Sequence, residues 1–172
     1  MSRVRLFMAA SVDGYIATAD GCLDWLEPYD GSDFGYDRLM AEVEVVVVGR
    51  TTFDLIAGFP AWPYPGKRVV VLTHRPLLSP PAGVECHAGD VAALTERLRR
   101  QCSADIFIDG GAQTVRAFLD ADLIDHLDLF TIPILLGQGI PRFLPSRRRT
   151  SLRLADSETM AQGVVRSTYL RP

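Results

Sequence analysis

Cysteine and histidine are scarce in this sequence of 172 residues, which holds only three of each. Cys22, Cys86 and Cys102 are odd in number, lie far apart and form no C-x-x-C pair. This pattern argues against a disulfide framework and a zinc site, and it is typical of proteins of the reducing cytosol. His74 and His126 show no metal-ligand spacing either. We therefore expect a cytoplasmic protein without a metal centre.

Positive net charge and long hydrophobic segments are also lacking. Lys and Arg number 18 against 21 Asp and Glu, a net charge of −3, so nothing favours nucleic acid or an anionic membrane as a partner. No apolar run is long enough to cross a bilayer. The basic run Arg147–Arg149 is typical of a solvated loop. Residues 1–11 superficially resemble a signal peptide, but their apolar run is too short and predicts a first strand instead.

What the sequence does contain is the material of one globular domain. Hydrophobic residues make up 48% and charged residues 23%, and the chain is long enough for a sizeable core. No repeat, low-complexity tract or linker divides it. We therefore predict a single domain over residues 1–172.

Short apolar runs alternate with amphipathic segments along the chain. Strands are predicted at Val4–Ala10, Tyr15–Ala17, Val45–Val48, Arg68–Leu72, Val84–His87, Ile106–Ile108, Leu127–Leu136, Leu152–Ala155 and Val164–Leu170. Helices are predicted at Phe34–Val43 with Ser32 or Asp33 as cap, Thr51–Ile56, Val91–Gln101 and Thr114–Leu119. The order predicts an α/β sheet that is mostly parallel, with antiparallel strands at its C-terminal side. Pro133 inside the longest strand indicates an edge, a bulge or a bend.

The stretch Ile106–Gln113 combines a buried strand, two glycines and the start of a helix. Gly110 and Gly111 permit positive φ and remove side chains that would keep a ligand away. The helix that follows, predicted from Thr114, has free N–H groups and a positive dipole end that suit a phosphate. A tight turn without a ligand is the alternative.

Ligands of parallel α/β sheets bind beyond the carboxyl ends of the strands. The residues there are Asp13-Gly14, Gly49-Arg50-Thr51-Thr52, Thr73-His74-Arg75 and Gly110-Gly111. They supply glycines, hydroxyls and two arginines, but no nucleophile with a neighbouring base. This set predicts a site for a phosphate-rich cofactor rather than a hydrolytic site.

Several spaced motifs resemble those of the dihydrofolate reductase superfamily. They are Gly49-Arg50-Thr51-Thr52-Phe53, Pro65-Gly66-Lys67-Arg68, Leu72-Thr73-His74-Arg75 and Gly110-Gly111. Ser11–Ala17 and Pro133–Gly139 are more similar to the branch that contains the reductase domain of bacterial riboflavin biosynthesis. The resemblance covers nearly the whole chain. It implies a dihydrofolate-reductase-like three-layer α/β/α fold, NADPH as cofactor and a homodimer.

The resemblance also implies which residues bind the cofactor. Arg50 and Arg75 can grip a 2′-phosphate, because guanidinium forks suit phosphate, and this pair favours NADPH over NADH. A surface ion pair is the alternative for either arginine. The further cofactor-binding candidates are Ile16, Ala17, Gly49, Thr51, Thr52, Thr73, His74, Gly110, Gly111, Ala112 and Gln113. Ile16 and Ala17 match the backbone that meets the nicotinamide, and the resemblance implies a cis peptide between Gly110 and Gly111.

The substrate side is less well defined. Asp13, Trp25 and Lys67 are candidates for substrate contact, and holding the turn is the alternative for Asp13. Lys67 stands where folate reductases have an arginine for the glutamate tail. A point-charge lysine is a poorer carboxylate partner, which argues against dihydrofolate as the main substrate.

Catalysis is expected to need a proton source beside the hydride acceptor. Folate reductases keep a carboxylate in or just before the first helix, where Asp33 and Asp37 lie here. Thr131 resembles the threonine that supports that carboxylate. These three residues are the catalytic candidates.

The leading hypothesis is an NADPH-dependent reductase of a small heterocycle, similar to 5-amino-6-(5-phosphoribosylamino)uracil reductase. The alternatives are a dihydrofolate reductase and an NADPH-binding module without redox turnover, since fold does not decide function. Leu127–Leu136 is apolar enough to be the interface strand of a homodimer as well as a core strand.

Overall fold

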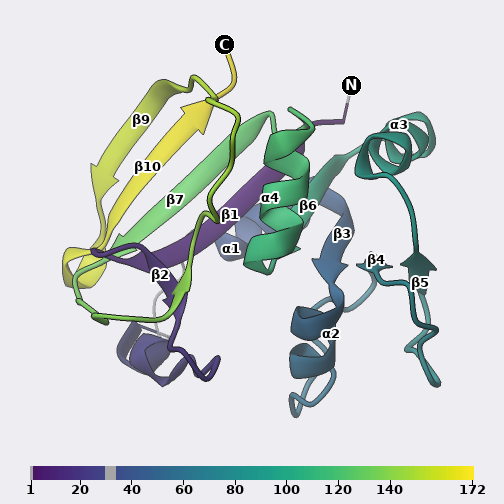
Figure 1. Ribbon diagram of the computed structural model, residues 1–172, viewed down its shortest axis with the longest axis horizontal. Coiled ribbons are helices and arrows are strands. Elements are labelled where there is room, and N and C mark those ends of the chain that lie inside the picture. Colours follow the sequence, from purple (N-terminus) through teal and green to yellow (C-terminus); the bar gives the residue numbers. More distant parts are fainter. Residues whose placement is uncertain (1, 30–33) are drawn as a thin grey trace.

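The computed structural model describes residues 2–29 and 34–172 (Figure 1). The main strands are β1 (Val4–Ser11), β3 (Val43–Gly49), β4 (Arg68–Leu72), β5 (Val84–His87), β6 (Asp105–Gly110), β7 (His126–Ile132), β9 (Arg153–Thr159) and β10 (Val165–Leu170). Two short strands, β2 (Tyr15–Ala17) and β8 (Ile140–Pro141), pair with each other. The α-helices are α1 (Tyr36–Glu42), α2 (Arg50–Ile56), α3 (Val91–Gln101) and α4 (Ala112–Asp120). The 3-10 helices are η1 (Asp24–Tyr29) and η2 (Ala161–Gly163).

The main strands form one eight-stranded sheet in the order β5-β4-β3-β6-β1-β7-β10-β9. Neighbours from β5 to β7 run parallel, while β10 is antiparallel to both β7 and β9. The predicted sheet, mostly parallel with antiparallel C-terminal strands, is confirmed.

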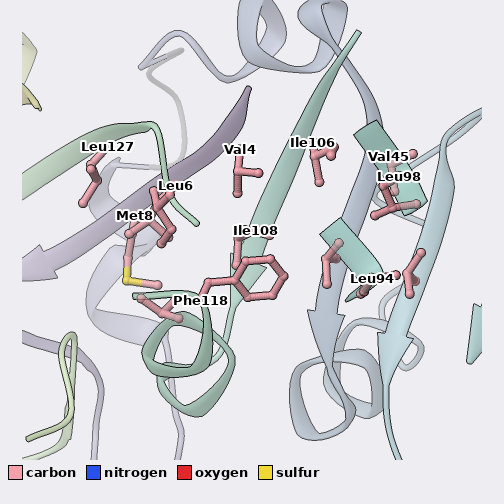
Figure 2. Close-up of a cluster of buried hydrophobic side chains, with 14 of the residues drawn as sticks. Val4, Leu6, Met8, Val45, Leu94, Leu98, Ile106, Ile108, Phe118 and Leu127 are labelled. Carbon is pink, nitrogen blue, oxygen red and sulfur yellow. The ribbon is translucent and has the colours of Figure 1, made fainter. Parts of the chain in front are cut away.

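Helices cover both faces of the sheet because its central strands are apolar on both sides. On one face, Leu94 and Leu98 of α3 and Phe118 of α4 pack against even-numbered residues of β1 and β6, including Leu6 and Ile108 (Figure 2). We call this the α3/α4 face.

On the opposite, α1/α2 face, Leu39 of α1 and Phe53 and Ile56 of α2 pack against Val46 and Phe107. Strand residues of odd and even number therefore face different helices, as the period of two requires. The three-layer α/β/α architecture is confirmed.

The predicted strand Leu127–Leu136 is too long at its C-terminal end. β7 ends at Ile132, just before Pro133, and the N–H of Ile134 donates to the Ile132 carbonyl at 2.7 Å. Proline has no N–H for the ladder, so the chain bends there. β7 lies between β1 and β10, so it is an interior strand, which confirms the core-strand alternative for Leu127–Ile132.

The first helix also begins later than predicted. α1 has Gly35 at its N-cap, with φ 90° and ψ 16°, instead of Ser32 or Asp33, and both of those positions lie outside the described residues. A left-handed backbone favours glycine, which explains the choice of residue. The long connection before α1 contains the 3-10 helix η1, which was not predicted because the polar composition of this segment indicated a loop. No helix within residues 2–29 and 34–172 is long and apolar enough to span a membrane.

Candidate functional site

The predicted motifs meet at one edge of the sheet. β3, β4 and β6 end together, because the register pairs Gly49 with Leu72 and Val48 with Gly110. α2 follows directly from the tip of β3 (Figure 1). This is the edge at which parallel α/β sheets bind ligands.

The first turns of α2 and α4 approach each other across two glycines. A Cβ atom on Gly49 would lie 2.6 Å from Thr114 Oγ1, and one on Gly111 would lie 3.2 Å from Thr52 Oγ1. Gly110 and Gly111 are joined by a cis peptide bond. Gly49 and Gly111 are the N-caps, and no side chain caps either helix. First-turn N–H groups and two threonine hydroxyls therefore line a narrow cradle that suits phosphate.

The two arginines expected at the 2′-phosphate have different surroundings. Arg50 Nε donates to both carboxylate oxygens of Asp54, at 2.8 and 2.9 Å, which is the ion pair of the alternative, and the role of Arg50 at a 2′-phosphate stays a prediction. Arg75 is exposed, and its guanidinium has no hydrogen bond or ion pair with any residue of the described chain. The hydroxyl of Thr73 accepts from the Arg75 N–H at 3.1 Å and donates to the Arg75 carbonyl at 3.0 Å, which fixes this turn.

The other cofactor candidates lie around the same edge. Thr51 is exposed in the first turn of α2, His74 after β4 and Gln113 in the first turn of α4, where Ala112 is buried. Each of these positions follows the end of β3, β4 or β6.

β2 carries the two residues expected at the nicotinamide. Ala17 is buried, and Ile16 packs against the core of the α3/α4 face. β8 lies so close to β2 that a Cβ atom on Gly139 would be 2.2 Å from the Ala17 carbonyl oxygen. Only glycine allows this approach, which holds β2 against the segment that leads into β8.

Asp13 holds the turn between β1 and β2. Its Oδ1 accepts from the Ser11 hydroxyl at 2.6 Å and from the Leu136 N–H at 3.1 Å, and its Oδ2 accepts from the Gly137 N–H at 2.7 Å. The Ser11 hydrogen bond, together with those two N–H groups, lowers the pKa of Asp13. Asp13 therefore has the turn-holding role that was the alternative to substrate contact.

Trp25 and Lys67 are both committed to the fold. Trp25 is 7% exposed and packs in a cluster with Phe130. Lys67 Nζ donates to the carbonyl oxygens of Met40 and Val43, at 2.6 and 2.7 Å, and so caps the C-terminus of α1. We leave both residues out of the proposed substrate site.

The three catalytic candidates are not brought together. Asp33 lies outside the described residues, and Asp37 is exposed on α1. Strand alternation places Thr131 on the side of Leu129, which packs in the α3/α4 core, while Phe130 faces the opposite way. Thr131 therefore lies on the wrong face to support a carboxylate of α1, because a shift of one residue along a strand reverses its side.

An acid that was not predicted as a site residue lies at the edge instead. Asp109 is the penultimate residue of β6, directly before the cis Gly110–Gly111 peptide, and shares the α1/α2 face with Phe107. The hydroxyl of Tyr64, which is 3% exposed, donates to Asp109 Oδ2 at 2.6 Å. Burial raises the pKa of Asp109, and the Tyr64 hydrogen bond offsets part of that rise. The sequence offered one indication of Asp109, because it is a carboxylate near the end of an apolar strand and directly before two glycines.

Two aromatic residues complete the surroundings of this acid. Tyr36 of α1 is half-buried, and burial together with the charges of Asp109 and Asp37 raises the pKa of Tyr36 to about 12. The Tyr36 ring meets Phe7 edge-on with ring centroids 5.9 Å apart. A half-buried acid with two phenols near it therefore lies directly before the glycine pair of the cradle.

This combination of fold, glycine cradle and acid can be compared with known proteins. The model of the RibD C-terminal domain matches residues 2–166. The chain belongs to the RibD C-terminal domain family. It is 35% identical over 161 residues to the uncharacterized protein YwjB of Bacillus subtilis, covering 92% of each chain. The crystal structure of a Shewanella protein named for riboflavin biosynthesis superposes with a TM-score of 0.90 at 33% identity, covering 99% of both chains.

A relative with a more specific name matches this chain over less than half of its own length. The chain is 28% identical over 151 residues to the riboflavin biosynthesis protein RibD of Corynebacterium ammoniagenes, which covers 80% of this chain and 44% of that protein. The resemblance found in the motifs is confirmed, and the chain is a RibD-type reductase-like domain.

Proposed function

We propose that this protein is an NADPH-dependent reductase of a small nitrogen heterocycle. One observation carries the proposal: Asp109, a half-buried acid held by the Tyr64 hydroxyl, directly precedes the glycine pair of the cradle. A reductase of this kind must hold a dinucleotide and a proton-donating or hydrogen-bonding group within one site. Family membership supports the same activity.

The cradle residues fit the cofactor. Gly49 and Gly111 allow Thr114 and Thr52 to approach them closely, and we assign a pyrophosphate to the first-turn N–H groups of α2 and α4 beside them. Arg75, exposed and without a partner among the described residues, is the side chain that we assign to a 2′-phosphate. Its planar guanidinium suits that dianion, so NADPH is favoured over NADH.

The chain's own residues supply the substrate side of the reaction. Bound NADPH would provide the hydride for an electron-poor carbon of the substrate. Tyr64 orients Asp109, whose Oδ1 makes no hydrogen bond with any described residue and so is left for a substrate nitrogen. A carboxyl with a raised pKa can donate a proton to that nitrogen as the carbon is reduced.

Dihydrofolate fits this site poorly. Lys67, the counterpart of the arginine that binds the glutamate tail in folate reductases, donates to Met40 and Val43 instead. We therefore place a small heterocycle ahead of dihydrofolate.

The experiment that tests the proposal has two stages. Calorimetric titration should show NADPH bound at least about tenfold more tightly than NADH, since one well-placed charge-assisted contact contributes about 1.5–3 kcal/mol. NADPH oxidation should then follow the addition of pyrimidine, pterin or flavin substrates. Binding without oxidation across all three classes would instead indicate a nucleotide-binding module, and absence of NADPH binding would end the proposal.

A further inference from the structure

We infer that the protein has a second anion-binding site, separate from the cofactor cradle, which takes a small ligand with one or two phosphate groups. This site does not depend on the proposed function. It is built from the basic run Arg147–Arg149, which the sequence indicated as a solvated loop, and from Arg171, which follows the end of β10.

A cavity of about 420 Å³ brings these parts of the chain together. Its lining includes Asp122, the segment 148–151 and Arg171, which come from the turn after α4, the loop before β9 and the C-terminal end of the chain. β10 ends where β7 begins, since Leu170 pairs with His126, whereas the cradle lies beyond the last residues of β3 and β6. The cavity and the cradle therefore occupy opposite edges of the sheet, and Figure 1 shows the C-terminus and α2 at opposite ends of the molecule.

Two arginines of the cavity are held in place by neighbouring acids. Asp122, whose backbone is left-handed with φ 58°, accepts from Arg148 Nη2 at 2.8 Å through its carboxylate and from Arg171 Nη1 through its carbonyl oxygen. Asp125 Oδ1 accepts from Arg171 Nη2 at 2.9 Å, and Asp125 Oδ2 accepts from the Val4 N–H at 2.8 Å. A guanidinium group has five N–H donors, so both arginines keep donors for a ligand. Because their positions are already fixed, binding a ligand orders little more of the chain.

The other donors of the cavity have no partner within the described chain. The exposed Arg149 guanidinium makes no hydrogen bond or ion pair with any described residue, and neither do the hydroxyls of Thr150 and Ser151. The backbone N–H groups of these three residues also make no hydrogen bond within the described chain. Three guanidinium groups therefore line the cavity together with one carboxylate side chain, and this excess of positive charge and free donors suits a phosphate.

The size and chemistry of the cavity limit the ligand. A phosphate dianion accepts several hydrogen bonds at once, and the planar guanidinium fork matches its oxygens in pairs. The described lining contains no aromatic side chain on which a nucleic-acid base could stack. The net charge of −3 also disfavours a long polyanion. We therefore assign the site to a small phosphate compound and not to a nucleic acid.

Titration of the isotope-labelled protein with inorganic pyrophosphate, followed by NMR at low salt, locates the site. The backbone amide signals of residues 149–151 should shift and saturate with a Kd of about 1 mM or below. The affinity should fall as salt rises, because screening weakens the attraction between exposed charges. Inorganic phosphate and ribose 5-phosphate should move the same signals, and the tighter of these two shows whether the site takes a free anion or an ester.

A pair of matched variants gives a second readout. Arg149→Ala removes a guanidinium that has no partner in the described chain, so the variant should fold normally and bind pyrophosphate about tenfold more weakly. Arg38→Ala on α1 is the control, because it removes the same charge from an exposed side chain that is paired with Glu42. It should leave the affinity for pyrophosphate unchanged.

Two outcomes would overturn the inference. One is pyrophosphate that leaves the amide signals of residues 149–151 unmoved up to about 10 mM, including the case in which only signals of the cradle respond. The other is an equal affinity of Arg149→Ala and Arg38→Ala for pyrophosphate. A protein that binds no NADPH but responds at residues 149–151 would remove the proposed function and support the second site.

Discussion

At the scale of single residues, the Tyr64–Asp109 pair can be separated by conservative substitutions. Tyr64→Phe removes the 2.6 Å hydrogen bond and leaves the half-buried Asp109 carboxyl without it. We expect a loss of about 1–3 kcal/mol in the free energy of unfolding, because a buried polar group left unpaired pays its desolvation cost. Urea denaturation at neutral pH measures this.

The matched control is Tyr29→Phe. The Tyr29 hydroxyl makes no hydrogen bond to a described residue, so this variant should stay within about 0.5 kcal/mol of the wild type. Equal stabilities for the two variants would show that the Tyr64 hydroxyl does not stabilise the fold.

Gly139 is a second residue whose role can be tested. In Gly139→Ala the new Cβ would lie 2.2 Å from the Ala17 carbonyl, so β8 must move away from β2. We expect a loss of about 1–3 kcal/mol in stability, the usual cost of overpacking, and weaker binding of NADPH. Gly58→Ala is the control, because its Cβ would have an ordinary contact of 3.4 Å with the Leu55 carbonyl. A Gly139→Ala protein as stable as that control would contradict the close approach of the two strands.

At the scale of elements, β1, β7 and β10 are joined by a buried ionic network. Asp128 of β7 accepts from His126 Nε2 at 2.9 Å, from the Thr168 hydroxyl at 2.7 Å and from Arg5 Nη2 at 3.3 Å. Burial raises the pKa of Asp128, but the hydrogen bonds of His126 and Thr168 and the charges of His126 and Arg5 outweigh it. The net pKa is about 2, against a usual 3.8.

This lowered pKa predicts a defined loss of stability in acid. The stabilisation by ionised Asp128 is fully present above the unfolded pKa of 3.8 and is lost as pH falls through about 2. We expect this carboxylate to account for about 2 kcal/mol of the wild-type stability lost over that window, since one pKa unit corresponds to about 1.4 kcal/mol. Asp128→Asn should lack this component, which urea denaturation from pH 5 to pH 2 would reveal.

Thr168→Val provides the comparison within the same network. It removes one of the hydrogen bonds that lower the pKa of Asp128, so its acid-dependent loss should begin at a higher pH than in the wild type. Identical pH profiles for wild type and Asp128→Asn would show that Asp128 contributes no acid-linked stability.

At the scale of the whole molecule, cofactor binding should appear as thermal stabilisation. NADPH at about 100 times its dissociation constant adds about 2.7 kcal/mol. For a chain of this length that corresponds to a rise of roughly 5–11 °C in Tm, at about 2–4 °C per kcal/mol. Arg75→Ala should reduce the shift with NADPH and leave any shift with NADH unchanged. The 2′-phosphate assignment fails if Arg75→Ala affects both cofactors alike.

The homodimer and its interface remain predictions at this scale. β7 is paired on both edges, and its Leu127, Leu129, Phe130 and Ile132 are buried within the chain itself, whereas Leu135 of the predicted interface segment is exposed. Sedimentation at micromolar concentration should give twice the 19.0 kDa mass of the chain. A monomer under those conditions would rule out a stable dimer.

The sequence by itself determined the local elements and the motifs. Val45–Val48 and Ile106–Ile108 became buried parallel strands because continuous apolar, β-branched runs favour strands covered on both faces. The glycines at the ends of β3 and β6 indicated the position of the cradle, because a close approach of two backbone segments depends on the missing side chain of glycine. These features depend on residues adjacent in the chain, so the sequence alone sufficed.

Only the tertiary structure decided which side chains meet. Tyr64 and Asp109 are 45 positions apart, and Lys67 reaches the end of α1, so no local pattern reveals either contact. Thr131 lies on the α3/α4 face and not on the face of α1, because register decides which face each residue of a strand occupies. A shift of one position moves every side chain of the strand to the opposite face. Arg50 took an ion pair within its own helix instead of remaining free for phosphate. Such choices depend on the competing partners that folding brings within reach, and those partners are fixed only when the sheet is assembled.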